Sequence, residues 1–246
     1  MNKNDVLIVG VVSDDPFALD VAHYFRQRED IADLISMKNF ANTEFCPRFI
    51  KEEDSVENLG NRLAGKTVII VSTCTGDHTR NSLAMRTFLV ARAAKDNGAE
   101  KVFLVQPDLF YSAQDRGPRP EHGRVLFERT ITDYKKFDGQ PFSSLLYAQL
   151  LKQSGVDGVV TVHNHSISVQ KLFSEIFDGQ FWNLSPSELY AHYFLTHGPS
   201  VNHGPGQSDP LILCAPDAGA SPFVKEVYDV MKSQVKDMLL PFDCRL

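Results

Sequence analysis

Residues 67–106 read TVIIVSTCTGDHTRNSLAMRTFLVARAAKDNGAEKVFLVQ, and this stretch decides the fold. The short apolar run Thr67–Ser72 predicts a strand, and Thr79–Asn97 predicts a long helix with Gly98 as its C-cap. A second apolar run, Lys101–Gln106, predicts the next strand. A strand, a helix and another strand in this order are typical of the parallel sheets of α/β proteins.

The same alternation runs through almost the whole chain. Further strands are expected at Val6–Val12, Gly158–Val162, Leu211–Cys214 and Met238–Pro241. Further helices are expected at Phe17–Arg26, Pro141–Ser154, Val169–Phe177, Ser187–Thr196 and Ser221–Val235. We therefore predict an α/β protein whose parallel sheets are flanked by helices on both faces.

The alternation restarts near residue 158, which predicts two similar α/β halves. We expect a first domain over residues 1–156 and a second, partial domain over residues 157–246. Two segments interrupt the pattern. Residues 117–140 are polar and charged and resemble an insertion between a strand and its helix, while residues 198–209 are rich in turn-forming residues and are expected to form a mobile excursion.

Composition excludes several classes of protein. The chain has 246 residues, of which 43% are hydrophobic, so it can bury a core and is neither disordered nor fibrous. Its 25 basic and 31 acidic residues give a formal charge of −6, which argues against nucleic-acid partners and anionic membranes. No apolar run approaches the ~20 residues of a membrane helix, and the first residues lack a signal-peptide pattern. We expect a cytoplasmic protein.

The four cysteines indicate a reducing compartment. Cys46, Cys74, Cys214 and Cys244 lie far apart and form no C-x-x-C pair. A zinc knuckle is therefore not expected, and reduced thiols are.

Polar segments follow several of the predicted strands, and ligands of parallel sheets bind beyond the carboxyl ends of the strands. The segment Ser72–Asp77 leads into a helix whose free N–H groups can hold an anion, or Asp77 or Thr79 can simply cap that helix. The segment Gln106–Arg116 concentrates polar and aromatic residues that suit a nucleotide, although such loops are often only well packed.

Two later segments carry candidate metal ligands. In Thr161–His165, residues two apart on a strand share a face, so His163 and His165 can converge on one ligand; the alternative is one solvated and one core-bonded histidine. In Ala215–Ala220, Asp217 offers a carboxylate, or it caps the following helix. A site pairing His165 with Asp217 suits Mg²⁺ held loosely with waters and substrate phosphates.

The four polar segments described above occur in the same order along the chain as similar segments of the ribose-phosphate pyrophosphokinases, also called phosphoribosyl pyrophosphate synthetases. The chain resembles this family. The resemblance covers most of the chain and begins with Phe40–Phe45 and Arg48, which are similar to the loop by which one subunit lends adenine contacts to its neighbour. The other similar motifs are Val71–Thr75, the ATP-loop-like Tyr111–Arg119, the metal-histidine-like Gly158–His165 with Gln170 and Phe173, Asn183–Pro186 and Ala215–Gly219.

The resemblance implies a fold and a reaction. It implies two type I phosphoribosyltransferase-like domains, the second incomplete here, in a homo-oligomer built from dimers and often a hexamer. The implied substrates are ATP and ribose 5-phosphate, with Mg²⁺ as the cofactor. The implied activity is ribose-phosphate diphosphokinase, in which the sugar's anomeric hydroxyl attacks the β-phosphorus of ATP to give phosphoribosyl pyrophosphate and AMP.

The resemblance also assigns site residues. Phe40 would stack on adenine, and Asn42 and Glu44 would form its hydrogen bonds. Three residues of the ATP-like loop would contact ATP: Gln114, Asp115 and Arg116. His165 and Asp217 would hold Mg²⁺, and Arg245 would supply a catalytic cation.

Several positions depart from the family pattern. Asn42 stands where the family has Asp, Ala113 where it has Arg, and His163 where Asp is usual. Cys244 occupies the position of the catalytic Lys, and a neutral thiol cannot supply the cation that a polyphosphate transition state needs. Leu246 replaces a substrate-binding Arg, and the family's sugar-phosphate loop has no counterpart up to this residue.

These departures leave two other functions open. One is a non-catalytic or regulatory paralogue that associates with active synthetase subunits, which the charge losses at Asn42, Ala113 and Cys244 favour. The other is a phosphoribosyltransferase that consumes the pyrophosphorylated sugar, which the adenine-type segment Phe40–Glu44 disfavours. The retained His165 and Asp217 favour catalysis.

Overall fold

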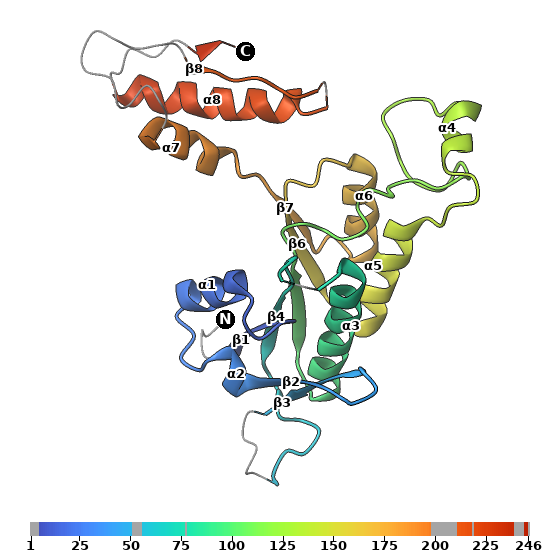
Figure 1. Ribbon diagram of the computed structural model, residues 1–246, viewed down its shortest axis with the longest axis vertical. Helices are drawn as coiled ribbons and strands as arrows, with labels where there is room; N and C mark the ends of the chain where they lie inside the picture. Colours follow the sequence, from blue (N-terminus) through green and yellow to red (C-terminus); the bar gives the residue numbers. More distant parts are fainter. Residues whose placement is uncertain are drawn as a thin grey trace. The chain divides into compact units, whose positions relative to one another are not determined.

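Strand–helix alternation dominates the computed structural model, which describes residues 5–50, 56–76, 78–197, 211–217, 219–238 and 244–245 (Figure 1). The chain divides into two compact units, residues 1–184 and residues 185–246. None of the helices in the described ranges is both long enough and apolar enough to cross a membrane.

The first unit is built on a five-stranded sheet in the order β1-β4-β5-β6-β7, with every neighbouring pair parallel. The strands are β1 (Val6–Gly10), β4 (Thr67–Val71), β5 (Lys101–Val105), β6 (Gly158–Val162) and β7 (Phe181–Leu184). Residues 6–10 are all buried, as expected for a strand covered on both faces. The predicted parallel α/β fold is therefore confirmed.

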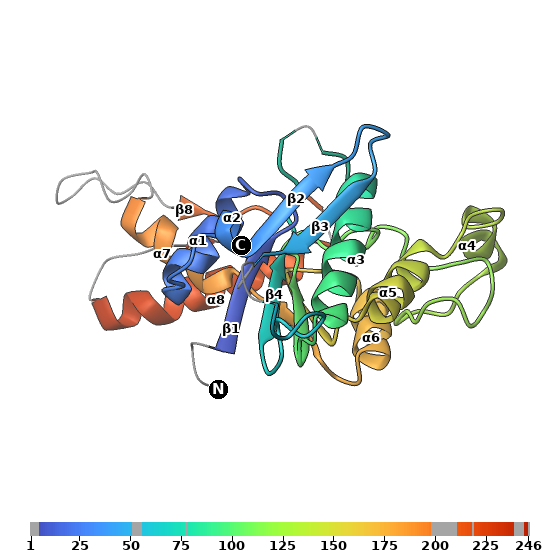
Figure 2. The same ribbon diagram turned by 90° about the horizontal axis from the view of Figure 1, so that it is seen from below.

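Helices cover the sheet on two sides (Figures 1 and 2). One side carries α3 (Arg80–Asp96), α5 (Ser143–Ser154) and α6 (Ile167–Ile176), and the other carries α1 (Pro16–Phe25) beside β1. Each helix forms where the sequence predicts one. Gly155 ends α5 in the left-handed conformation (φ 104°), which glycine adopts without a steric cost.

A hairpin that the sequence did not predict lies between α1 and β4. After the short α2 (Ile31–Leu34), strands β2 (Ile35–Asn39) and β3 (Phe45–Phe49) pair antiparallel, so that Phe40–Glu44 forms the tip. Pro47 stands inside β3 opposite Met37. Proline is uncommon within strands, so the local sequence pattern argued against one here.

The polar segment 117–140 lies between β5 and α5, where an insertion was expected, and we call it the inserted segment. It contains a helix that the sequence did not predict, α4 (Ile131–Lys136). The hydroxyl of Thr130 caps this helix by accepting from the Asp133 N–H at 3.3 Å. The inserted segment is therefore folded around its own short helix.

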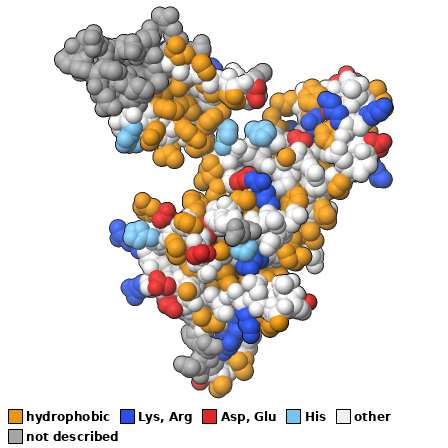
Figure 3. All heavy atoms as spheres, viewed as in Figure 1, with side chains coloured by type: hydrophobic (Ala, Val, Ile, Leu, Met, Phe, Trp, Pro, Cys, Tyr) orange, Lys and Arg blue, Asp and Glu red, His pale blue; other side chains and the backbone are white. Residues whose placement is uncertain are grey.

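The second unit contains α7 (Ser187–His197), α8 (Ser221–Met238) and the parallel pair β8 (Leu211–Ile212) and β9 (Cys244–Arg245). Its small core lies between the two helices and comprises Ala191, Leu195, Val227 and Met231. Hydrophobic side chains also remain exposed on α7; they are Leu189, Tyr190 and Tyr193. Figure 3 shows hydrophobic side chains on the surface of this unit.

Three expectations concern the second half of the chain: a domain boundary, a strand and an excursion. The predicted boundary after residue 156 falls inside the first unit, because β6 and β7 extend the first sheet and the division follows Leu184. The predicted strand Met238–Pro241 begins at the last residue of α8, and its remaining residues lie outside the described ranges. The predicted excursion at residues 198–209 lies outside them as well.

Candidate functional site

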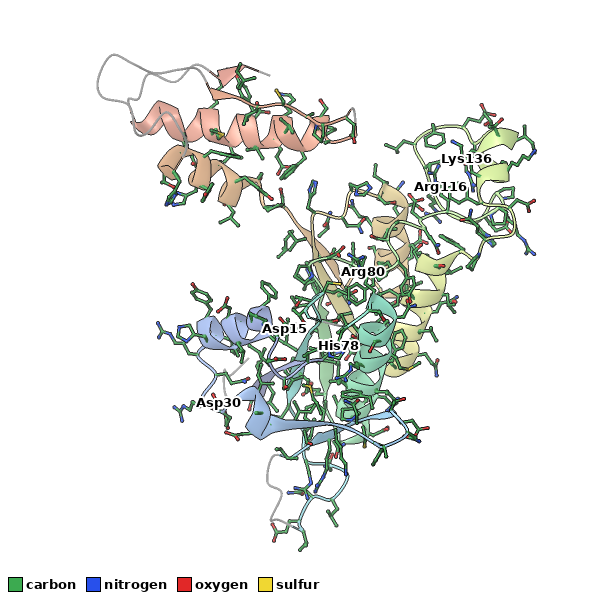
Figure 4. All side chains as sticks on the ribbon, viewed as in Figure 1. Asp15, Asp30, His78, Arg80, Arg116 and Lys136 are labelled. Atoms are coloured by element: carbon green, nitrogen blue, oxygen red, sulfur yellow. The ribbon has the colours of Figure 1, made fainter. Side chains whose placement is uncertain are left out.

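The loops after β1, β4, β5 and β6 gather at one edge of the first sheet, because all of these strands are parallel. Figure 4 labels Asp15, His78 and Arg80 at this edge; Asp15 follows β1, His78 follows β4, and Arg80 begins α3. The sequence predicted that polar residues at strand ends would meet here. The following contacts show which of them do.

The first two loops are joined through Asp15. Its buried carboxylate caps α1, accepting from the N–H groups of Phe17 (3.0 Å) and Ala18 (3.4 Å), and also accepts from the Thr73 hydroxyl at 2.6 Å. A hollow of about 510 Å³ lies beside this contact, lined by Val12, Asp14, Pro16, Thr75, Gly76 and His78. The loop after β4 therefore borders an open space at the strand ends.

The alternative that this loop caps a helix is also observed. The Thr79 hydroxyl accepts from the Ser82 N–H at 3.2 Å and caps α3. Asp77, the other capping candidate, lies outside the described residues.

A buried polar network holds the start of the loop after β5. The Gln106 side chain accepts from the Phe110 N–H and from the Tyr147 hydroxyl, both at 3.0 Å, and donates to the Ser72 hydroxyl at 3.2 Å. Burial raises the pKa of the Tyr147 phenol, so it remains a neutral donor. Gln106 thus connects three elements beneath the site.

The same loop is joined to the beginning of α3. Arg80 donates a hydrogen bond to Asp108, and this bond raises the pKa of the Arg80 guanidinium. The Tyr111 hydroxyl donates to the Asn81 side chain at 2.6 Å. Tyr111 has a φ of 58°, a left-handed conformation that is uncommon for an aromatic residue. The loop is therefore held in one particular path.

The loops after β5 and β6 meet through Asp115. Its carboxylate accepts from the Ser166 hydroxyl at 2.7 Å, and its backbone carbonyl accepts from the Ser168 hydroxyl at 2.7 Å. Ser166 also caps α6 by accepting from the Val169 N–H at 3.3 Å. The ATP-like residues Gln114–Arg116 are thus held next to the sequence neighbour of His165.

His163 and His165 are both exposed and lie beyond the end of β6. The argument that they share a strand face therefore does not apply to them. Between them, Asn164 is buried, and its backbone carbonyl accepts from the side chains of Gln170 (2.7 Å) and Asn183 (3.0 Å). These bonds fix the backbone from which both imidazoles project.

Arg116 is occupied by protein groups. Its Nε donates to Asp115 at 3.1 Å, and its Nη1 donates to Asp133 of the inserted segment at 3.0 Å. Gln114, in contrast, has an exposed side chain, while its backbone carbonyl accepts from the Ser144 hydroxyl at 2.8 Å. Of the two residues, Gln114 has the side chain more open to a ligand.

The adenine-type residues lie at the tip of the β2–β3 hairpin. Phe40 is 46% exposed, and the Lys38 ammonium lies 5.4 Å from the centre of its ring. Asn42 accepts from the Glu44 N–H at 3.2 Å, so part of its hydrogen-bonding capacity shapes the turn. A hollow of about 790 Å³ separates the tip from α3, and its lining includes Phe40, Glu44, Phe45, Met85, Arg86 and Leu89.

Arg86 fixes the base of this hollow. It is buried, donates to the Val11 carbonyl (3.3 Å) and the Asn39 side chain (3.2 Å), and lies 4.1 Å from the centre of the Phe45 ring. Burial lowers the pKa of its guanidinium. The hairpin is thereby joined to α3 and to the end of β1.

The remaining predicted residues belong to the second unit. Asp217 accepts from the Ala220 N–H at 2.9 Å in the turn before α8, which begins at Ser221. Arg245 lies in β9. The structure describes its backbone but not its side chain, and Leu246 lies outside the described residues. The pairing of His165 with Asp217 joins residues of two separately described units and remains a prediction.

The available donors limit what kind of metal site is possible. Within the described ranges, no group of three or more His, Cys, Asp or Glu side chains is placed to hold a metal ion. An exposed imidazole and an exposed carboxylate fit Mg²⁺ that keeps most of its ligands as waters and phosphate oxygens. They do not fit a closed protein cage.

Comparisons with known proteins agree with the motifs. Residues 27–155 match the family model for the N-terminal domain of ribose phosphate pyrophosphokinase. Ribose-phosphate pyrophosphokinase 4 of Saccharomyces cerevisiae is 26% identical over 182 residues, which cover 74% of this chain and 46% of the yeast protein. A ribose-phosphate pyrophosphokinase of Methanobrevibacter smithii is 24% identical over 211 residues, covering 85% of this chain and 56% of that protein.

A solved structure supports the fold. The crystal structure of phosphoribosylpyrophosphate synthetase from Mycobacterium smegmatis matches with a TM-score of 0.64 at 18% identity, covering 98% of this chain and 63% of that one. The chain thus spans about half the length of the curated relatives described above. On the family model, which matches more than half of its residues, the chain belongs to the ribose-phosphate pyrophosphokinase family.

Proposed function

We propose that the protein is a ribose-phosphate diphosphokinase, which transfers the diphosphoryl group of Mg-ATP to ribose 5-phosphate. The observation that supports this most is the bond between Asp115 and Ser166, because it joins the ATP-like loop to the histidine-bearing loop. The two loops lie far apart in the sequence, and the reaction needs a nucleotide and a cation in one place. The yeast and archaeal relatives named above carry the corresponding name.

In the proposed reaction, the anomeric oxygen of ribose 5-phosphate forms a bond to the β-phosphorus of ATP. The bond from that phosphorus to the α–β bridging oxygen breaks, AMP leaves, and the hydroxyl proton passes to solvent. Such transfers depend mainly on in-line positioning and on neutralising phosphate charge. We assign binding of the adenine to Phe40, Asn42 and Glu44, and contact with ATP to Gln114.

Cation binding and the catalytic charge are assigned to three further residues. His165 and Asp217 hold Mg²⁺, which neutralises phosphate charge when bound. Arg245 supplies the positive charge that Cys244 cannot.

The hairpin tip also supports a homo-oligomer. Its aromatic and polar side chains are exposed, so they are available to a nucleotide held by a neighbouring copy in a dimer-based assembly. We propose a cytoplasmic protein with ATP and ribose 5-phosphate as its partners, and with neither nucleic acid nor membrane among them.

The direct test is AMP release from ATP by the full-length protein, followed by chromatography with and without ribose 5-phosphate and Mg²⁺. We expect release that needs both. His165→Ala should lower the rate at least about tenfold, because a ligand of the cation is lost. His23→Ala, which removes an exposed histidine on α1, is the matched control and should leave the rate unchanged.

AMP release that does not depend on ribose 5-phosphate would contradict the proposed activity, and so would the absence of AMP release. ATP binding without AMP release would point instead to a regulatory paralogue.

A further inference from the structure

The inserted segment is not explained by the proposed reaction, yet it is joined to the loop that follows β5. It lies at residues 117–140, directly after Arg116, and its helix α4 lies away from the central sheet (Figure 1). Figure 4 labels Arg116 and Lys136, which lie near each other at this end of the unit. The contacts between the segment and the loop run through charged side chains.

Arg129 organises the inserted segment. Its side chain is 5% exposed, and its Nε donates to Asp133 at 2.6 Å. Its terminal nitrogens donate to the backbone carbonyls of Gly117 (2.8 Å), Arg119 (3.1 Å) and His122 (3.1 Å). One guanidinium therefore holds the turn that leads out of the β5 loop.

Asp133 is shared between two arginines. One carboxylate oxygen accepts from Arg129, and the other accepts from Arg116 at 3.0 Å. The carboxylate is 10% exposed, and the hydrogen bond from Arg129, together with the charge of Arg116, lowers its pKa. A buried carboxylate needs such partners, because an unpaired buried charge is costly.

The series of bonds continues from Arg116 into the site. Arg116 donates to one oxygen of Asp115, and Ser166 donates to the other. Arg129, Asp133, Arg116, Asp115 and Ser166 thus form one continuous chain of hydrogen bonds, which we call the arginine–aspartate relay. It runs from the inserted segment to the residue after His165.

Close packing accompanies the relay. A Cβ atom added at Gly123 would lie 2.7 Å from the Asp115 carbonyl oxygen and 2.8 Å from Cγ of Arg116. The Arg124 N–H donates to the Ser168 hydroxyl at 3.1 Å, so the inserted segment also contacts α6 directly. The segment therefore presses on both of the loops that the relay joins.

We propose that the inserted segment is a positioning element that holds the nucleotide loop and the histidine loop in their working geometry through the arginine–aspartate relay. Arg116 and Asp133 are then positioning residues. Contact of the Arg116 Nη1 with phosphate would remove the partner that this nitrogen gives to Asp133. The role in nucleotide binding rests on the proposed function; the ordering of the two loops does not.

The first test is hydrogen exchange of the full chain carrying Asp133→Asn. We expect exchange to become about tenfold faster or more in residues 111–116 and at the Val169 amide, which the Ser166 hydroxyl caps. Exchange within α3 should not change, which also verifies that the variant folds. Asp138→Asn, the same change at an exposed position of the segment, is the matched control and should match the wild type.

Faster exchange confined to residues 117–140 would overturn the proposal, since it would mean that Asp133 stabilises only its own segment. Unchanged exchange throughout would overturn it as well.

The second test is affinity for a non-hydrolysable ATP analogue with Mg²⁺, measured by calorimetry. Asp133→Asn should weaken binding by about tenfold to a hundredfold through misplaced loops, and Asp133→Glu should restore part of it. Both aspartates act through one relay. Asp133→Asn should therefore weaken binding of the analogue little further in a chain that already carries Asp115→Asn. Fully additive losses would contradict the relay.

The outcomes separate the two proposals. A wild-type chain that binds no nucleotide would defeat the proposed function, while the exchange experiment would still decide whether the relay orders the loops.

Discussion

The tip of the β2–β3 hairpin and the loop after β5 both carry residues expected to meet ATP, but they are built differently. At the tip, Phe40 and Glu44 line a hollow and their side chains remain accessible. In the β5 loop, Asp115 and Arg116 are engaged by groups of the same unit. One region offers contacts to a ligand, and the other holds its shape before a ligand arrives.

The difference shows that a charged residue in a ligand-binding motif need not touch the ligand. A guanidinium paired with two carboxylates is already engaged, so moving it to phosphate would break bonds that the fold uses. An exposed aromatic ring has no such cost, because its face is open to stacking. Substitutions of the bonded side chains of the β5 loop should therefore change stability, and substitutions at the tip should change affinity.

The largest effect is expected for Gln106→Leu, which removes the buried amide beneath the β5 loop. The Phe110 N–H and the Tyr147 hydroxyl would lose their acceptor, and the Ser72 hydroxyl would lose a donor. Unsatisfied buried groups cost about 1–3 kcal/mol each, so we expect the free energy of unfolding to fall by about 2–4 kcal/mol. Urea unfolding measures this change.

The matched control is Gln114→Leu, an exposed glutamine of the same loop, which should change stability by less than about 0.5 kcal/mol. Equal effects of the two substitutions would show that the buried hydrogen bonds of Gln106 do not hold the loop.

The next effect is expected for Phe40→Ala at the hairpin tip. Loss of a stacking ring should weaken ATP binding by about 1–3 kcal/mol while leaving the unfolding transition nearly unchanged. Calorimetric titration with the non-hydrolysable analogue measures the affinity. Tyr24→Ala removes another exposed aromatic ring, on α1, and should leave affinity as it is. An unchanged affinity for the Phe40 variant would exclude this ring from the site.

The smallest effect is expected in acid and concerns Asp133. Its pKa is lowered in the folded chain, so the unfolded chain takes up the proton first as the pH falls. The stabilisation is complete above about pH 5, begins to fall near the unfolded-state pKa of about 4, and is lost as the pH falls through the lowered folded value. Unfolding curves between pH 7 and pH 3 should therefore fall less steeply for Asp133→Asn than for the wild type. Parallel curves would show that the carboxylate is not held by its arginines.

Much of the fold could be predicted from the sequence. Buried parallel strands have a strong local pattern, as in Val68–Val71, and the long helix before Gly98 has its own periodicity. The hairpin could not be predicted in this way, because Pro47 disfavours a strand and its stability comes from tertiary contacts such as those of Arg86.

The sequence predicted the location of the candidate site better than it predicted the side-chain contacts within it. The parallel arrangement brings the loops after β5 and β6 to one edge, as expected, and Asp115 joins them. The pairing of Asp133 with Arg116 was missed because the two residues are 17 positions apart in the sequence. The available signal was Thr130 as a helix cap, with Arg129 directly before it and Asp133 in the first turn after it.

Pro47 has a consequence for how the molecule avoids wrong partners. Because the Phe40 N–H donates to the Glu44 carbonyl at 2.8 Å, pairing alternates along the hairpin, and Met37 and Pro47 form a non-hydrogen-bonded pair. The position at which proline lacks an N–H therefore points away from β2. A strand of another molecule that approached the outer edge of β3 would lack one hydrogen-bond donor at Pro47. This discourages edge-to-edge aggregation without weakening the pairing of β2 with β3.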